Sequence, residues 1–327
     1  MSSGVTLAQL LAPVDEGMER MRGILLEQVT DSSAAVGDMT DHVSRFRGKQ
    51  LRAALVLLSG DATGNSTDEH ATIAAVVEMI HLATLVHDDI LDGAEVRRRV
   101  ACVNQRWDNQ IAVLLGDFLY ARAFALSTEL SSRLCSQMLS ETTRRICVGE
   151  IEQSTSRYDF EMGQERYERI AGAKTANLYA AACELGARYP GGHDETGAEM
   201  RAFGWEIGLA FQIVDDCLDV TGTLAEVGKS VGTDVEDGKV TLPVLHAYEI
   251  ADAAVRTRIR DTFCEPGLEG RVERLAEVCD LDAGVRFAEA RAHALIAQAR
   301  ARLSTLPAGP ARSSLEELGD FVLARRS

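Results

Sequence analysis

Residues 14–189 of this 327-residue chain contain no proline, and no other feature of the sequence constrains the fold as much. Proline costs about 3 kcal/mol inside a helix, so a long interval without it permits long helices. Apolar residues recur at intervals of three and four over 51–62, 73–91 and 112–126, which predicts a helix in each range. Alternating strand-like runs joined by hairpin dipeptides are not seen in the sequence, which therefore predicts an all-α protein.

Breaks rich in glycine, proline and small polar residues separate the helical segments. They lie at 60–70, 189–197, 221–239, 264–270 and 306–313. The first break contains candidate N-caps for the next helix, namely Ser66, Thr67 and Asp68. None of the breaks looks like a domain linker, so we expect residues 1–327 to form one domain of helices packed around a central space.

The composition excludes several classes of function. The formal net charge of −16 makes the chain a poor binder of nucleic acid, which needs basic surface. The seven cysteines are odd in number and show no C-x-x-C spacing, so we expect reduced core residues and neither disulfides nor zinc ligands. The first residues lack a secretory signal pattern, and no apolar stretch approaches the roughly 20 residues that span a bilayer. We therefore expect a cytoplasmic protein without a membrane span.

One acidic motif occurs twice. The sequence DDILD at 88–92 recurs as DDCLD at 215–219, and each copy follows an apolar helical stretch. Positions i and i+4 share one face of a helix, so the first and last aspartates of each copy point the same way. A single copy would more often be an exposed helix end, but two copies predict carboxylate clusters that hold a polyphosphate through Mg²⁺, which prefers oxygen ligands. The predicted metal ligands are Asp88, Asp89, Asp92, Asp215, Asp216 and Asp219.

Basic side chains accompany the first acidic motif. Arg97 and Arg98 follow it closely, and guanidinium groups bind phosphate oxygens in a bidentate fork. Lys49 and Arg52 form a second basic pair, three residues apart on one predicted helix face. His81 lies two helical turns before the motif, where phosphate binding and a buried structural role are equally compatible with the residues alone.

Five blocks, taken in order, resemble the trans-type isoprenyl diphosphate synthases, also called polyprenyl synthetases. The blocks are GKQLR (48–52), EMIHLATLVHDDILDGAEVRR (78–98), GEIEQ (149–153), KTANL (174–178) and FQIVDDCLDVTGTLAEVGKSVGTDVEDGKVTLP (211–243). One such block would be a weak signal, but five at the family's spacing are specific. The resemblance implies the type I isoprenoid synthase fold, a single-domain helical bundle around a deep central cavity.

The resemblance also implies what the site binds and which residues form it. The six aspartates would hold about three Mg²⁺ ions. The allylic diphosphate would be held by Arg97, Lys174, Thr175, Gln212, Lys229 and Lys239. Isopentenyl diphosphate would be held by Gly48, Lys49, Arg52, His81 and Arg98. The residues implied to act in the reaction itself are Asp88, Asp89, Asp92, Lys174 and Asp215.

The implied reaction is a head-to-tail condensation by a prenyltransferase of isoprenoid biosynthesis. The diphosphate group of the allylic substrate leaves as pyrophosphate, the double bond of isopentenyl diphosphate attacks C1 of the resulting allylic cation, and a proton is lost. The protein would supply positioning, charge stabilisation and exclusion of water. The resemblance further implies that the enzyme is a homodimer.

Product length is predicted from the helix that precedes Asp88. In the resembled family, bulky aromatic side chains four and five residues before the motif stop chain growth early. Here those positions are the small residues Thr84 and Ala83, with Ile80 one turn further back. The helix back to Val76 offers about 18 Å of depth, so we expect a C30–C50 product near octaprenyl for quinone side chains. The alternative is a geranylgeranyl or farnesyl product, if the pocket is closed by Phe118, Tyr120 or Phe124.

The sequence departs from the resembled family beside the predicted isopentenyl diphosphate site. Gln50 and Ala53 stand where the family has Arg and Pro, and residues 99–102 read Arg-Val-Ala-Cys where it favours Gly-x-Pro-Thr. These changes leave the predicted metal ligands intact. A terpene cyclase is disfavoured because the second motif is DDCLD, and a non-catalytic subunit of a heteromeric synthase is disfavoured because all six aspartates are present.

Overall fold

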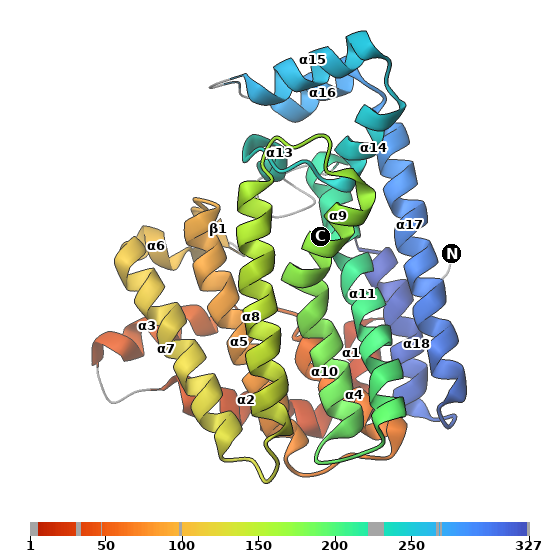
Figure 1. Ribbon diagram of the computed structural model, residues 1–327. Coiled ribbons are helices and arrows are strands. Elements are labelled where there is room, and N and C mark those ends of the chain that lie inside the picture. Colours follow the sequence, from red (N-terminus) through yellow and green to blue (C-terminus); the bar gives the residue numbers. More distant parts are fainter. Residues whose placement is uncertain are drawn as a thin grey trace. The chain divides into compact units, whose positions relative to one another are not determined.

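The computed structural model describes residues 6–30, 34–46, 48–97, 100–221, 232–265, 268 and 270–325. These residues are almost entirely helical, as Figure 1 shows. The extended elements among them are two short strands, β1 (Val96–Arg97) and β2 (Val100–Ala101), which pair antiparallel. The prediction of an all-α protein is confirmed.

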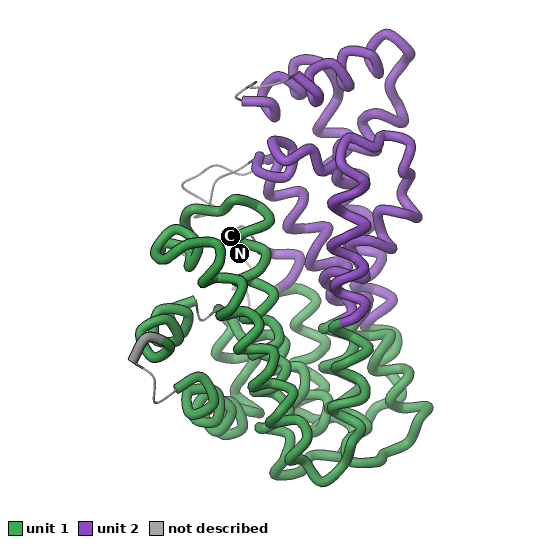
Figure 2. Tube along the Cα trace, turned by 60° about the vertical axis from the view of Figure 1, so that its left-hand side comes forward, with its two compact units in different colours: residues 1–143, 178–204, 300–321 green, residues 144–177, 205–299, 322–327 purple. Residues whose placement is uncertain are grey.

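The chain divides into two compact units, coloured separately in Figure 2. Unit 1 comprises Met1–Thr143, Leu178–Gly204 and Arg300–Phe321, and unit 2 comprises Arg144–Asn177, Trp205–Ala299 and Val322–Ser327. Several helices pass from one unit into the other, and the expected organisation as one domain stays a prediction. Each unit is described by itself below.

Unit 1 is built from short N-terminal helices and three long ones. Its elements are α1 (Leu7–Leu11), η1 (Ala12–Val14), α2 (Asp15–Val29), α3 (Ala34–Ser44), α4 (Leu51–Thr63), α5 (His70–Leu91), the strands β1 and β2, α6 (Val103–Arg106), α7 (Asn109–Thr128) and η3 (Leu303–Thr305). Unit 2 contains α9 (Gly163–Ala171), the π-helical turn η2 (Gly172–Ala176), α13 (Thr233–Glu236), α14 (Leu242–Ile250), α15 (Ala253–Cys264) and α16 (Arg271–Val278). The helices shared by both units are α8 (Leu134–Thr155), α10 (Asn177–Arg188), α11 (Asp194–Thr221), α17 (Leu281–Arg302) and α18 (Pro310–Leu323).

The core of unit 1 forms around α5, which packs against α2, α4 and α7. Most residues of α5 are buried, so this helix lacks the polar face of a surface helix. Gly116 lets α7 approach closely, because a Cβ there would lie 2.1 Å from Nε2 of His87 on α5. The three predicted helices correspond to α4, α5 and α7, so these predictions are confirmed.

The start of α5 differs from the prediction. Its N-cap is Glu69, which makes no side-chain cap hydrogen bond, so the expected caps at Ser66, Thr67 and Asp68 are wrong. The backbone N–H of Thr67 instead donates to Nδ1 of His70 at 3.0 Å. Thr67 precedes α5, so this contact ties the preceding turn to the first residue of the helix and caps none of the N–H groups of the helix itself.

The breaks in the sequence are shorter in the structure than predicted. Helix α11 already begins at Asp194, and α18 begins at Pro310, inside two of the predicted loops. Proline is tolerated at a first helical position, because its missing N–H has no partner there in any case. Most of the break at 221–239 lies outside the described residues, although α13 falls within it.

Helices α5 and α7 are long and apolar enough to cross a membrane, judged by length and composition alone. This corrects the expectation that no apolar stretch approaches that length. The most apolar window of α5 is 72% buried inside the protein, as in the core helix of a globular domain. The corresponding window of α7 is 39% buried, and Val113 and Leu114 lie exposed on that helix.

Candidate active site

The first acidic motif lies at the C-terminal end of α5, in unit 1. Asp88 and Asp92 are both partly exposed and stand one turn apart, with the backbone N–H of Asp92 donating to the carbonyl of Asp88 at 2.8 Å. Asp89 is fully buried. Two carboxylates of this motif are therefore accessible to a cation, while the third faces the protein.

The carboxylate of Asp89 binds Arg97. The Nε and Nη2 atoms of Arg97 lie 2.7 and 2.6 Å from Oδ1 of Asp89. Burial alone would lower the pKa of Arg97, but the hydrogen bond and the charge of Asp89 raise it instead. Arg97 is thus held as a cation, and Asp89 fixes its direction.

The other oxygen of Asp89, Oδ2, is buried and has no hydrogen-bond partner among the described residues. Cys102 lies beside this carboxylate. Burial, followed by the charge and hydrogen bonding of Asp89, raises the pKa of the Cys102 thiol to about 12. The thiol therefore stays protonated, and it is at most a weak donor to the aspartate.

The hairpin of β1 and β2, which carries Arg97, is braced from α3. Nε2 of His42 lies 2.7 Å from the carbonyl oxygen of Ala101, and Nη1 of Arg106 lies 2.8 Å from Nδ1 of His42. Because an arginine only donates, Nδ1 accepts and Nε2 donates. The predicted diphosphate ligands Arg98 and Lys229 lie outside the described residues.

The predicted isopentenyl diphosphate residues lie where α4 begins. Gln50 precedes the helix in a left-handed conformation (φ 50°), which few residues other than glycine adopt. The exposed Lys49 has its Nζ 5.1 Å from the centroid of the Phe321 ring, and Gly48 is exposed beside it. Gly48 and Lys49 therefore lie on the surface just before the helix.

Arg52, on the first turn of α4, is held from two sides. Its Nη1 lies 3.0 Å from Nε2 of His81, and its Cζ lies 4.4 Å from the centroid of the Tyr179 ring. The structure thus brings two predicted residues, Arg52 and His81, into direct contact. The role of Tyr179 was not predicted, because no sequence spacing relates an aromatic residue on α10 to α4.

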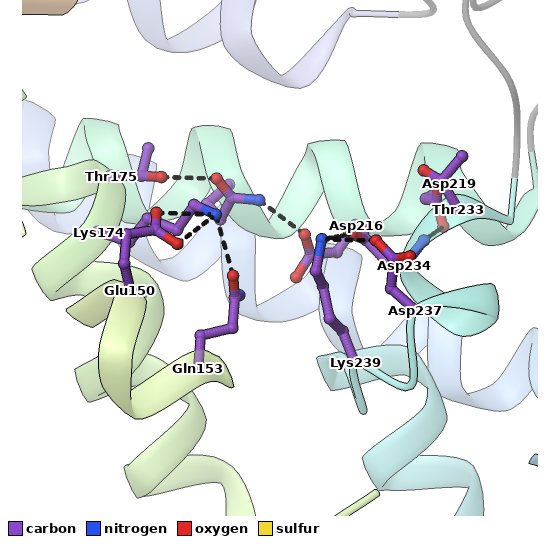
Figure 3. A network of polar contacts seen from close by, with 11 residues as sticks. Glu150, Gln153, Lys174, Thr175, Asp216, Asp219, Thr233, Asp234, Asp237 and Lys239 are labelled. Atoms are coloured by element: carbon purple, nitrogen blue, oxygen red, sulfur yellow. Dashed lines mark hydrogen bonds and ion pairs between the residues drawn. The ribbon is translucent and has the colours of Figure 1, made fainter. Parts of the chain in front are cut away.

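In unit 2, Lys174 and Thr175 lie on the π-helical turn η2. Such turns are rare and often occur at functional sites. Nζ of Lys174 lies 2.9 Å from Glu150 and 2.9 Å from Gln153 of α8, and Figure 3 shows these three side chains converging. Gly149 permits this approach, because a Cβ there would lie 2.9 Å from the backbone nitrogen of Lys174. This accounts for the GEIEQ block, whose individual roles the sequence did not reveal.

A chain of hydrogen bonds links η2 to the second acidic motif. Thr175 donates to Gln212 at 2.7 Å, and Gln212 donates to Oδ1 of Asp216 at 2.8 Å. The hydroxyl of the buried Tyr167 donates to the other oxygen of Asp216 at 2.5 Å. Burial, followed by the charge of Asp234, raises the pKa of Asp216 to about 8. Asp216 is therefore an internal anchor of this network.

Asp219 and Lys239 organise the segment around α13. Asp219 is buried and accepts hydrogen bonds from the Thr233 hydroxyl and from the backbone N–H of Asp234, at 3.2 and 3.1 Å. Nζ of Lys239 lies 3.2 Å from both Asp234 and Asp237. Figure 3 shows this cluster next to Asp216.

Asp215 is the most accessible aspartate of the second motif, with 27% of its side chain exposed. Nη2 of Arg325, near the C-terminus, lies 3.3 Å from its Oδ1. The same guanidinium lies 3.9 Å from the ring centroid of Phe211, one turn earlier on α11. Nothing in the sequence pattern pointed to Arg325, because a residue more than a hundred positions away is related to the motif only by the fold.

The accessible carboxylates give the site its chemistry. Among the described residues, no three Asp, Glu, His or Cys side chains are grouped so as to hold a metal ion by themselves. Asp88 and Asp92 of unit 1 are nevertheless oxygen ligands of the kind that Mg²⁺ shares with water and with substrate phosphates, and so is Asp215 of unit 2. Each acidic motif by itself therefore offers donors that fit Mg²⁺, and the role of each aspartate stays a prediction.

The residues predicted to set product length lie on α5, before the first motif in the chain. Ala83 and Ile80 are fully buried, and the hydroxyl of Thr84 donates to the carbonyl of His81 at 2.7 Å. From α7, the ring of Tyr120 lies 5.9 Å from that of His87, and it stacks on Phe124 with a centroid distance of 6.5 Å.

Comparisons with known proteins identify the family of the chain. The family model of the polyprenyl synthetases matches residues 33–279. The chain is 32% identical to the octaprenyl diphosphate synthase of Escherichia coli (strain K12), over 95% of this chain and 96% of that one. It is 35% identical to heptaprenyl diphosphate synthase component 2 of Bacillus subtilis (strain 168), over 87% and 81%. Its structure resembles a polyprenyl synthase from Caulobacter crescentus CB15, complexed with calcium and isoprenyl diphosphate, with a TM-score of 0.94, 32% identity and complete coverage of both chains.

Proposed function

Because the chain belongs to the polyprenyl synthetase family and is a prenyltransferase, we propose that it extends an allylic diphosphate with isopentenyl diphosphate to an all-trans product of C30–C50. The preferred allylic primer is farnesyl or geranylgeranyl diphosphate. The observation that supports this most is the pairing of Asp89 with Arg97, because it holds a permanently charged guanidinium within the electrostatic influence of the partly exposed Asp88. That arrangement suits a diphosphate accompanied by metal ions.

Each substrate diphosphate has its own set of basic residues in this proposal. Arg97 and Lys174, with Lys229 and Lys239, bind the allylic diphosphate, while Lys49, Arg52 and Arg98 bind isopentenyl diphosphate. His81 accepts a hydrogen bond from Arg52 and so orients that guanidinium. Thr175 and Gln212 are fixed by their mutual hydrogen bond and line the reacting carbons.

Magnesium is the proposed cofactor, and Asp88, Asp92 and Asp215 are its proposed ligands because they are the accessible carboxylates. The Caulobacter relative was solved with calcium, another divalent ion that prefers oxygen ligands. When bound, Mg²⁺ neutralises charge on the diphosphate and favours its departure. Asp89, Asp216 and Asp219 act in this proposal by positioning Arg97, Gln212 and α13.

In this proposal the protein also excludes water from the allylic cation. The helix that carries the acidic motif supplies an apolar wall, since Ile80 and Ala83 are fully buried. The small side chain of Ala83 leaves room for the growing product. Tyr120 or Phe124 would close the pocket earlier in the alternative, short-chain function.

The proposed assembly is a cytoplasmic homodimer. Helix α7 has an incompletely buried apolar face, with Val113 and Leu114 exposed by 44% and 55%. Such a face suits burial against a second copy of the chain. A second candidate function follows from the Bacillus relative, whose name marks it as one component of an enzyme. In that case the chain would be one subunit of a heteromeric synthase and would need a partner chain for activity.

The test is an assay of the purified chain with farnesyl diphosphate, labelled isopentenyl diphosphate and Mg²⁺, with products resolved by mass. We expect pyrophosphate release and a C30–C50 product, and at least a hundredfold lower rate for Asp88→Ala or Asp215→Ala. Asp280→Asn, which alters an exposed ion pair with Arg286, is the control and should be active. Activity that appears only with a partner chain would favour the second candidate, and pyrophosphate release without chain elongation would contradict the first.

A further inference from the structure

We infer that Tyr179 is a positioning residue for isopentenyl diphosphate, because its ring holds the guanidinium of Arg52 in place. The inference rests on the proposed role of Arg52 in binding that diphosphate. The centroid of the Tyr179 ring lies 4.4 Å from Cζ of Arg52, within the range of a cation–π interaction. Both residues belong to unit 1.

Arg52 depends on this ring because its hydrogen bonds are incomplete. Nη1 lies 3.0 Å from Nε2 of His81, but Nε is buried and has no hydrogen-bond partner among the described residues. An arginine cannot release a proton to escape this cost. The electron-rich face of Tyr179 offers an attraction to the cation that needs no N–H acceptor.

The ring of Tyr179 is a rigid platform. Tyr179 is 1% exposed and is one of the largest fully buried side chains in the described part of the chain. A Cβ at Gly204 of α11 would lie 2.5 Å from the carbonyl oxygen of Tyr179, so two helices meet there at the backbone. Further along α10, a Cβ at Gly186 would lie 2.1 Å from the carbonyl oxygen of Val56, one turn after Arg52 on α4. These contacts fix α10, and hence Tyr179, against α4.

His81 and Tyr179 constrain Arg52 in complementary ways. Because Arg52 only donates, Nε2 of His81 must accept, which fixes one N–H direction within the guanidinium plane. Cζ of Arg52 lies over the face of the Tyr179 ring, which attracts the cation and so limits displacement of the guanidinium from this position. Bidentate recognition of a diphosphate depends on both the direction and the position of the guanidinium. Loss of the ring should therefore weaken binding of isopentenyl diphosphate and leave the chemical step largely intact.

The experiment compares Tyr179→Leu, which removes the ring, with Tyr179→Phe, which keeps the ring and removes the hydroxyl. Isopentenyl diphosphate is varied while farnesyl diphosphate is saturating. We expect Tyr179→Leu to raise KM for isopentenyl diphosphate about tenfold, which corresponds to 1.4 kcal/mol, with kcat changed less than threefold and KM for farnesyl diphosphate unchanged. Tyr179→Phe should change each constant less than threefold.

Tyr189→Leu is the matched control, because Tyr189 is another fully buried tyrosine of unit 1 whose hydroxyl contacts Glu69 and Ser131. It should lower the melting temperature without raising KM for isopentenyl diphosphate. If Tyr179→Leu does not fold, Tyr179→Met removes the ring with less loss of volume. A folded Tyr179→Leu or Tyr179→Met enzyme with the wild-type KM would overturn the inference, whereas a wild-type chain that does not consume isopentenyl diphosphate would overturn the proposed function instead.

Discussion

Arg97 directs both Nε and Nη2 at a single oxygen of Asp89, at 2.7 and 2.6 Å, while the adjacent Asp88 remains partly exposed. Two neighbouring aspartates of one motif thus have opposite surroundings. Asp89 is fully buried and pairs with a partly exposed arginine, whereas Asp88 is partly exposed to solvent and accessible to a ligand. The division suggests that the first motif holds metal with its outer residues and positions an arginine with its middle one.

Asp89→Ala is expected to destabilise the protein by about 3 kcal/mol, because it leaves the charge of Arg97 without its partner. Asp88→Ala should change stability by less than about 0.5 kcal/mol, since its side chain is partly exposed. Chemical denaturation without metal measures both values. The double variant Asp89→Ala/Arg97→Ala should recover part of the loss, and equal effects of the two single variants would contradict this division of roles.

Arg325→Met is expected to strengthen binding of a divalent ion several-fold in the absence of substrate. In the structure, the guanidinium lies 3.3 Å from Asp215 and so offsets the negative charge that would attract the ion. Methionine keeps the apolar contact with Phe211 and removes the positive charge. Calorimetric titration with Mn²⁺ in place of Mg²⁺ measures the change.

The control for this experiment is Arg286→Met, which breaks another arginine–aspartate pair of unit 2. Arg286 and its partner Asp280 are both exposed, and their closest N–O distance is 3.9 Å. This variant should leave Mn²⁺ affinity unchanged. Equal affinities of wild type and Arg325→Met would show that Arg325 does not compete with the ion at Asp215.

Asp216 should make the metal-free protein less stable as the pH rises from about 4 to about 8. Its pKa is raised to about 8 by burial and by the charge of Asp234, against an ordinary value near 3.8. Between these values the folded chain binds a proton that the unfolded chain has lost, so increasing pH favours unfolding. Denaturation in EDTA across this window should show a flatter dependence for Asp216→Asn, and an identical slope would rule out Asp216 as its source.

The cysteines should divide into two classes on alkylation at pH 8. Burial raises the pKa of Cys102, Cys135 and Cys183 to about 12 each, so only about one thiol in ten thousand is ionised at that pH. Cys147 and Cys264 are exposed. Treatment of the native protein with iodoacetamide, followed by peptide mass spectrometry, should modify the exposed pair first, and early modification of Cys102 would contradict its burial beside Asp89.

The sequence was sufficient to predict the helices and the acidic motifs, because both depend on local periodicity. The apolar spacing over 73–91 predicted the helix that became α5, and the i, i+4 spacing placed Asp88 and Asp92 one turn apart. The start of α5 was mispredicted: its N-cap is Glu69, whose side chain makes no cap hydrogen bond, and Nδ1 of His70 accepts from the backbone N–H of Thr67 before the helix. Local propensity could not anticipate a side chain that reaches back from the first turn.

The contacts that individual side chains make within the site could not be predicted from the sequence. Tyr179 contacts Arg52 and Arg325 contacts Asp215 across more than a hundred residues of chain, and no periodicity relates such pairs. The same holds for Gly149, whose missing side chain allows Lys174 to approach α8. The resemblance to a family identified the residue types of the site, but their contacts follow from how the helices pack.

Ala83→Tyr is expected to shorten the product to about C15–C20. Ala83 is fully buried on α5, five residues before Asp88, and a tyrosine there would fill the path along which the growing chain is proposed to extend. Ala83→Ser, which adds a single oxygen atom, is the control and should leave the length distribution unchanged. Mass-resolved products from farnesyl diphosphate decide the matter: an unaltered C30–C50 distribution in an active Ala83→Tyr enzyme would show that the chain grows along another wall.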